Sequence, residues 1–174
     1  DISNKFYQEA VHLVHEHHKS IGFAITQPEK IDILNQYGSD FWKTLSWDLT
    51  NTSLLHSLEH TGKKVYVSTG VSEIGEIVKV GNRFSNIDFI HTQLTDAVED
   101  VNLKAIETIK KETQKEVAFG LHCQEFKVLY VALAFQPSAI FIYIKDDTDG
   151  EHPDDVYAIG IDEIDMFAYN LNKL

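Results

Sequence analysis

Histidine is the residue type whose number and spacing in this chain most suggest chemistry. Nine histidines stand among 174 residues, and imidazole both transfers protons near neutral pH and binds transition metals. His15 and His18 lie three positions apart in one expected helix, and His56 and His60 lie four apart in another. Both spacings place two imidazoles on one helix face. A metal site is one interpretation, but we expect exposed clusters with incidental metal affinity.

Carboxylates form a second concentration of reactive groups. Nine of them fall within twenty residues: Asp146, Asp147, Asp149, Glu151, Asp154, Asp155, Asp162, Glu163 and Asp165. We expect a solvated acidic loop and helix start, with a cation site as the alternative. The whole chain has 27 acidic and 15 basic residues and a formal net charge of −12. Because that charge repels a phosphate backbone, we expect no nucleic-acid partner.

Size and composition predict a single globular domain over residues 1–174. Hydrophobic residues make up 43% and charged residues 24% of the chain, which excludes wholesale disorder. No apolar run approaches the roughly 20 residues of a membrane-spanning helix, and the first residues do not resemble a signal peptide. The single Cys123 fits a reducing compartment. We therefore expect a cytoplasmic protein with no membrane contact.

Helices alternating with strands must position these groups. Apolar runs predict strands at 22–26, 41–46, 64–69, 88–91, 117–121 and 139–144. Periodic stretches predict helices at 4–19, 28–38, 52–60, 73–80, 102–113, 126–135 and 162–171. The first helix has an apolar stripe of Phe6, Ala10, Leu13 and Val14, and Ser72 is the expected cap of the fourth. Strands without polar alternation indicate a parallel sheet covered by helices. Neither glycine-rich phosphate-loop signature occurs, which favours a barrel-type α/β fold.

Four stretches share their order with the motifs of one known family: Trp42–Ser46, His60–Gly70, Glu99–Ile106 and Gly150–Ile164. With them the chain resembles the N-acetylneuraminate (sialic acid) synthase family. That family shows a Tyr-Lys-Ile-Ala-Ser strand, a Thr-Gly-Lys-Pro-Val strand ending in Ser-Thr-Gly, a Pro-Glu-Asp-Val-Asn-Leu helix entry and a Pro-Gly-Pro-Asp-His loop. Four motifs in register make the resemblance specific.

The resemblance implies a (β/α)8 TIM-type barrel that condenses phosphoenolpyruvate with an N-acylmannosamine-type sugar, using a divalent metal such as Mn²⁺. The predicted strands match the family's third to eighth, so we expect six βα units of an incomplete eight-fold barrel. The family's first two strands and its C-terminal antifreeze-like domain have no counterpart in this sequence. Since a parallel sheet of six strands has two open edges, we expect an N-terminal segment outside this sequence, a second copy in a homo-oligomer, or a partner chain to close them.

The family's site residues carry over at five positions. Lys43 matches a phosphate-contacting lysine, and Asp154 matches the aspartate of the Pro-Asp-His loop; these are the catalytic candidates. Ser46 and Ser68 match hydroxyl positions that face the pocket, and His91 lies at a strand end by its expected mouth; these are the substrate-binding candidates. Ordinary structural roles, such as strand-end capping by the serines, remain open at each position.

The metal ligands depart from the family pattern. The family holds its metal with two histidines, and their positions are taken here by Gln124 and Tyr143. Tyrosine is a poor Mn²⁺ ligand, although a shifted loop could bring in the nearby His122 instead. Trp47 replaces a glycine and would place an indole near the pocket mouth. The sugar-contacting asparagine of the sixth strand is missing from the stretch that begins at His91.

Three interpretations follow from this mixture. The first is an active sugar-acid synthase. The second is a diverged, weakly active or inactive relative that keeps a pocket for a sugar or a phosphoenolpyruvate-like anion. The third is an inert barrel piece used for interaction. The losses at the metal positions favour a diverged relative.

Overall fold

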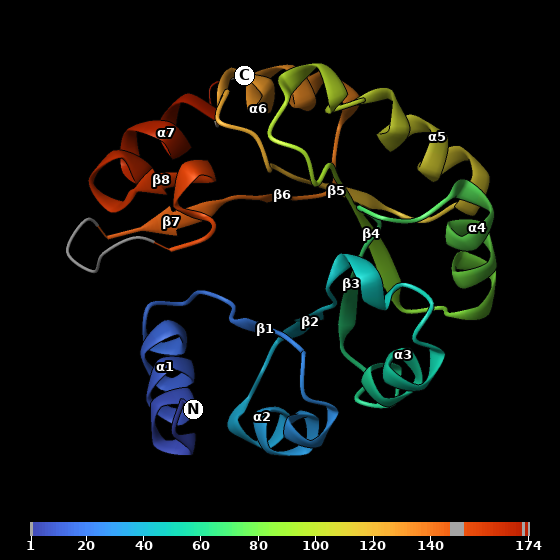
Figure 1. The fold of residues 1–174 in the computed structure, drawn as a ribbon. Helices are drawn as coiled ribbons and strands as arrows, with labels where there is room; N and C mark the ends of the chain where they lie inside the picture. Colours follow the sequence, from blue (N-terminus) through green and yellow to red (C-terminus); the bar gives the residue numbers. More distant parts are fainter. Residues whose placement is uncertain (1, 147–151, 172, 174) are drawn as a thin grey trace. The chain divides into compact units, whose positions relative to one another are not determined.

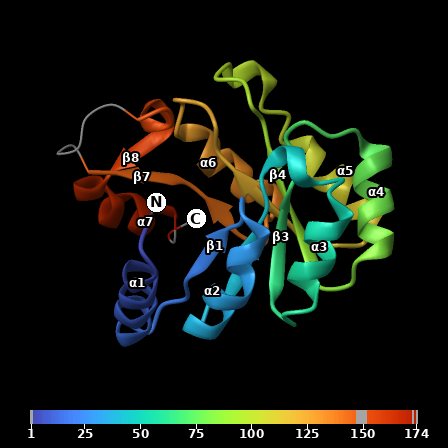
Figure 2. The same cartoon turned by 60° about the horizontal axis from the view of Figure 1, so that its bottom comes forward.

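A computed structural model describes residues 2–146, 152–171 and 173. Its main sheet has the strand order β1-β2-β3-β4-β5-β6, and an α-helix follows each of the first five strands (Figures 1 and 2). The strands are Gly22–Ala24, Phe41–Lys43, Lys64–Ser68, Ile87–Thr92, Val117–Gly120 and Ile140–Phe141. Pairing is parallel, as in β1 with β2 and in β5 with β6. The predicted incomplete (β/α) barrel is confirmed.

The helices follow the predicted order. They are α1 Asn4–Glu16, α2 Ile31–Tyr37, α3 Thr52–Glu59, α4 Ile74–Arg83, α5 Lys104–Thr113, α6 Lys127–Ala132 and α7 Ile164–Leu171. Single 3-10 turns flank them at Pro28–Lys30, Ser46–Asp48, Val98–Asp100, Leu133–Phe135, Asp155–Tyr157 and Ile161–Glu163. In the part of the chain that is described, no helix is both long and apolar enough to span a membrane.

The chain divides into two compact units, residues 1–89 and 90–174, and the division lies inside β4. Each unit has its own fully buried side chains. Those of the first unit include Trp42, Leu58, Val65, Val67 and Phe89. Those of the second include Ile106, Val117, Ala118, Leu129 and Ala132. Burial of apolar surface of this kind is the main stabilising contribution to folding.

The rotation of α1 differs in part from the prediction: of the four residues of the expected apolar stripe, Ala10 and Val14 are half-buried. Phe6 and Leu13 are each 56% exposed, while Val11 is buried. The inward face carries Tyr7, whose ring meets Phe23 edge-on at 5.6 Å. About two turns further on, His15 Nε2 lies 2.8 Å from Asp40 Oδ2. Tyr7, Val11 and His15 are spaced four residues apart and therefore share the inward face of the helix. This rotation leaves Phe6 and Leu13 exposed.

Two local predictions at element ends are also wrong. Ser72 does not cap α4, because the helix begins after Glu73, whose N–H donates to the Glu76 carboxylate at 3.0 Å. The predicted strand at 139–144 divides at Ile142. Its second part, β7 Tyr143–Lys145, leaves the main sheet and pairs in parallel with β8, Ala158–Gly160. The sequence pattern missed β8, because three residues are too few to show a period.

Candidate functional site

In the first unit, strand alternation divides the side chains into two faces. Val65 and Val67 of β3 are fully buried on one face, with Trp42 opposite Val65 in the β2–β3 register. Lys43 is paired in that register with Tyr66, so it lies on the other face, which also carries Ser68. The fold therefore places the predicted lysine and a predicted serine on the same side of the sheet.

Ser46 and Ser68 form a buried pair. Ser46 begins the 3-10 turn after β2 and Ser68 ends β3, so both lie at the carboxyl ends of neighbouring strands. Their hydroxyl oxygens are 2.8 Å apart, and the residues are only 7% and 2% exposed. One of the two hydroxyl protons links the pair, and the other can donate a further hydrogen bond. Such a donor suits an anionic oxygen.

The same face carries an ion pair that sequence reasoning missed. Lys64 Nζ donates to Asp88 Oδ1 at 2.9 Å, and the Asp88 side chain is only 10% exposed. Lys64 begins β3, two residues before Tyr66, at the end of the strand away from Ser68. The charge of Lys64 is therefore compensated where it stands. The sequence does show that Lys64 lies on the polar face of the strand, because Lys64, Tyr66 and Ser68 alternate with Val65 and Val67.

A hydrogen bond to the backbone of Val101 holds the His91 ring within the second unit. Its ring is 6% exposed, lies 6.1 Å from the Phe119 ring, and its Nε2 donates to the Val101 carbonyl at 2.9 Å. Burial lowers the pKa of His91, and hydrogen bonds with the Val101 and Asn102 backbone only partly oppose this. The ring is therefore neutral near pH 7. These contacts give His91 a structural role, and its binding role stays a prediction.

His122 and Tyr143 come together after neighbouring strands. Gly120 is paired with Phe141, and the Leu121 N–H continues the ladder to the Phe141 carbonyl. Two residues beyond that pair, Tyr143 Oη lies 3.0 Å from His122 Nε2. The His122 ring also lies 5.5 Å from the Tyr157 ring. The structure therefore places His122, and not Gln124, beside Tyr143, the residue that stands at the family's second metal-histidine position.

The surroundings of this pair keep the phenol protonated. Burial raises the pKa of Tyr143, and the negative charge of Asp154 and the nearby Tyr157 raise it further. Asp154 is itself exposed, in the turn before Tyr157. The structure thus brings Asp154 near Tyr143, which the resemblance had not connected.

The residues present do not fit a divalent metal of the family type. Gln124 is exposed, and a protonated phenol is a poor ligand for Mn²⁺. His122 Nε2, the atom that would bind a metal, is within hydrogen-bonding distance of Tyr143. In the described ranges, no three His, Cys, Asp or Glu side chains are grouped closely enough to hold a metal ion.

Other residues that the sequence singled out make structural contacts. Arg83 Nη2 donates to His56 Nε2 at 3.0 Å, which occupies that imidazole nitrogen. In the acidic segment, Asp155 accepts from the His152 N–H at 2.8 Å, while Asp147, Asp149, Gly150 and Glu151 lie outside the described residues. Trp47 is 68% exposed. Its expected position near the pocket mouth stays a prediction.

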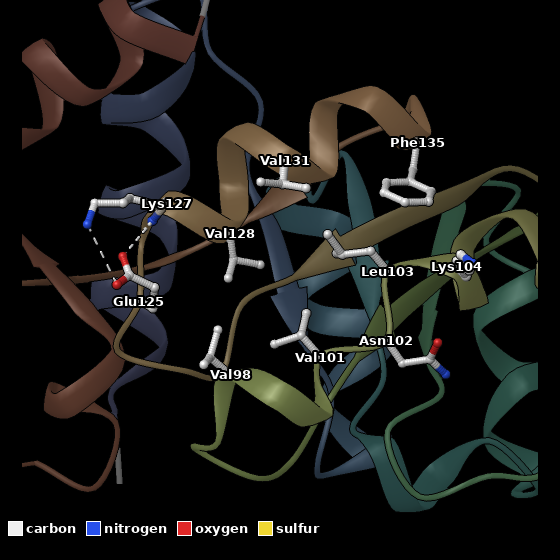
Figure 3. Close-up of a pocket in the computed structure, with 10 residues that line it drawn as sticks. All are labelled: Val98, Val101, Asn102, Leu103, Lys104, Glu125, Lys127, Val128, Val131 and Phe135. Atoms are coloured by element: carbon white, nitrogen blue, oxygen red, sulfur yellow. Dashed lines mark hydrogen bonds and ion pairs between the residues drawn. The ribbon is translucent and has the colours of Figure 1, made fainter.

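A groove in the second unit was not anticipated. It encloses about 580 Å³ between the loop after β4 and α6. Figure 3 shows Val101 and Leu103 facing Val128, Val131 and Phe135 across it. Glu125 and Lys127 lie at its rim, where the Lys127 N–H donates to Glu125 Oε1 at 3.2 Å. The lining is mainly apolar, so the groove differs chemically from the serine pair and from the His122–Tyr143 pair.

The fold and these positions can be compared with known proteins. The NeuB family model matches residues 5–174. The chain belongs to the NeuB family. This confirms the resemblance to the sialic acid synthase family. Three relatives show how far the likeness extends.

The chain is 26% identical over 155 residues to the N,N'-diacetyllegionaminic acid synthase of Campylobacter jejuni, covering 84% of this chain and 46% of that protein. It is 33% identical over 148 residues to an uncharacterized protein of Methanocaldococcus jannaschii, covering 81% and 44%. The solved N-acetylneuraminic acid synthetase of Leptospira borgpetersenii superposes with a TM-score of 0.91 at 18% identity, over 99% of this chain and 63% of that one. The chain therefore spans less than half the length of these two curated relatives, and the solved structure supports the fold alone.

Proposed function

We propose that this NeuB-family chain binds a phosphoenolpyruvate-like anion and an N-acylmannosamine-type sugar, and that it catalyses their condensation weakly or not at all. The buried Ser46–Ser68 pair carries the anion part of the proposal, because it holds a hydroxyl donor at the carboxyl ends of β2 and β3. In barrel enzymes of this kind that edge of the sheet is where substrates bind.

Lys43 is the cationic partner of the serine pair in this proposal. It ends β2 on the face that also carries Ser68, and an ammonium on a flexible stem suits a phosphate or carboxylate as a point charge. The anion would accept from the serine pair and from Lys43, which positions the three-carbon unit for reaction.

The weak step is activation of the sugar. Condensation forms a carbon–carbon bond between C3 of phosphoenolpyruvate and the aldehyde carbon of the sugar, whose oxygen takes up a proton. A water molecule adds to C2 of the phosphoenolpyruvate unit, and inorganic phosphate leaves. A divalent metal of the family type would polarise that aldehyde as a Lewis acid. The mismatch of Gln124 and Tyr143 with such a metal supports weak turnover or none. A non-catalytic sugar- and anion-binding module is the second candidate, and the same mismatch favours it.

The assay follows phosphate release from phosphoenolpyruvate and N-acetylmannosamine, with Mn²⁺ and with EDTA, beside thermal unfolding with phosphoenolpyruvate alone. We expect a saturable rise in Tm with phosphoenolpyruvate and little or no phosphate release. Turnover that depends strongly on Mn²⁺ would establish an active synthase and contradict the proposed divergence. The absence of both turnover and a Tm shift would contradict the proposed anion binding and favour the third interpretation, an inert barrel piece used for interaction.

Location and partners are part of the proposal. The buried free thiol of Cys123 fits a reducing cytoplasm. β1 and β6 stand at the two ends of the strand order, and unpaired strand edges favour further pairing. We therefore propose that a segment of the same protein outside this sequence, a second copy, or another chain pairs with these edges. The net charge of −12 argues against nucleic acid.

A further inference from the structure

The position where the family places its metal is taken by a connected polar pair. The His122 and Tyr143 rings meet edge-on with centroids 5.3 Å apart, and Tyr143 Oη lies 3.0 Å from His122 Nε2. Both residues are half-buried, so ligand atoms can reach them. A hydroxyl carries one proton and two acceptor lone pairs, so Tyr143 retains hydrogen-bonding capacity beyond its contact with His122.

We propose that His122 and Tyr143 form a metal-free subsite, in which the Tyr143 hydroxyl hydrogen-bonds a neutral oxygen of the sugar. The assignment of the ligand as a sugar rests on the proposed function; the absence of a metal role rests on the donor set alone. In this subsite His122 positions the phenol, and Tyr143 contacts the ligand.

The local charge selects a neutral oxygen over an anion. Asp154 lies close enough for its charge to act on Tyr143, and the pKa of this tyrosine is raised, first by burial and then by Asp154 and Tyr157. A second anion beside Asp154 would be repelled. A carbonyl or hydroxyl oxygen meets no such repulsion and can accept from a phenol that stays protonated. The anion and the sugar oxygen thus have chemically distinct contacts, with Lys43 near the serine pair and Asp154 near Tyr143.

The metal half of the proposal is tested without any substrate. The electron paramagnetic resonance signal of free Mn²⁺ measures metal binding to the unmodified protein and to the double variant His122→Asn/Tyr143→Phe. We expect the two titrations to agree within twofold, because any binding comes from surface groups such as the α1 histidines. A Mn²⁺ site that is present in the unmodified protein and lost in the double variant would overturn the proposal.

The sugar half is tested by titrating N-acetylmannosamine in EDTA and following binding by calorimetry. Tyr143→Phe should raise the Kd roughly 3- to 10-fold, the loss expected for one neutral hydrogen bond. Tyr169→Phe is the matched control, because Tyr169 is 60% exposed on α7, and it should leave the Kd unchanged. An unchanged Kd in Tyr143→Phe, or no sugar binding by the unmodified protein, would overturn the sugar subsite. Phosphoenolpyruvate binding, measured separately, then shows whether the anion part of the proposed function survives.

Discussion

The hydroxyl oxygens of Ser46 and Ser68 lie 2.8 Å apart although 22 residues separate them in the sequence. Parallel pairing of β2 with β3 brings them together, since Ser68 ends β3 and Ser46 begins the turn that follows β2. A buried hydroxyl pair that is made by two strand ends gives the molecule a fixed donor at the edge where substrates of barrel enzymes bind.

Replacement of either serine should weaken anion binding. Ser68→Ala removes one hydroxyl of the pair and should raise the phosphoenolpyruvate Kd roughly tenfold, because hydrogen bonds to charged groups contribute about 1.5–3 kcal/mol. Ser57→Ala is the control, since the Ser57 hydroxyl donates to the Ser53 carbonyl on the exposed face of α3. The phosphoenolpyruvate Kd of this variant should not change. Calorimetric titration measures both. Equal affinities for Ser68→Ala and the unmodified protein would remove the serine pair from the site.

Substitution by phenylalanine should change stability much more at Trp42 than at Trp47. Trp42 is fully buried, and its Nε1 donates to Thr61 Oγ1 at 2.8 Å. Trp42→Phe loses that bond and leaves a cavity, so it should lower the free energy of unfolding by about 2–4 kcal/mol. Trp47→Phe changes a mainly exposed ring and should stay within about 0.5 kcal/mol. Urea denaturation measures both, and similar effects of the two substitutions would contradict the assigned core.

Sequence reasoning succeeded where a pattern repeats over many residues and failed where one contact decides. The order of strands and helices followed from alternating apolar runs. The family motifs singled out Ser46 and Ser68, which contact each other in the structure, while their binding role stays a prediction. The rotation of α1 could not be foreseen, because the long-range hydrogen bond between His15 and Asp40 selects among several apolar faces.

The same limit applies to the candidate site. An ungapped match placed Gln124 at the metal position, but the β5–β6 register decides which side chain meets Tyr143, and that side chain is His122. For His91, the strand-end position was correct, but its hydrogen bond to Val101 could not be read from a local pattern. Neither register nor a turn's backbone position has a signature in a single sequence.

His91 should make stability depend on pH. Its pKa in the folded protein lies below the ordinary 6.5, chiefly because the ring is buried. The unfolded chain therefore binds a proton first as pH falls, and the stabilisation, complete above pH 6.5, declines below it, with a slope of at most about 1.4 kcal/mol per pH unit. His91→Gln should lose this component between pH 7.5 and 5. Parallel pH profiles of unfolding for the two proteins would contradict it.

Two glycines should differ in sign when replaced by alanine. Gly38 ends α2 with φ at 106°, a left-handed conformation that alanine adopts at a cost, so Gly38→Ala should destabilise by about 1 kcal/mol. Gly75 lies in α4 with open space around its missing Cβ, so Gly75→Ala should stabilise by about 0.5–1 kcal/mol. Thermal unfolding measures both changes. Destabilisation by Gly75→Ala would show that this space is filled in solution.

We propose above that this NeuB-family chain binds a phosphoenolpyruvate-like anion with its own side chains and without a metal. Calorimetric titration of phosphoenolpyruvate tests it directly, with the unmodified protein in EDTA, the same protein in Mn²⁺, and Lys43→Met in EDTA. We expect saturable binding with the same Kd in EDTA and in Mn²⁺, and at least roughly tenfold weaker binding by Lys43→Met, since a charged contact is lost. Binding that requires Mn²⁺, or no saturable binding under either condition, would contradict it.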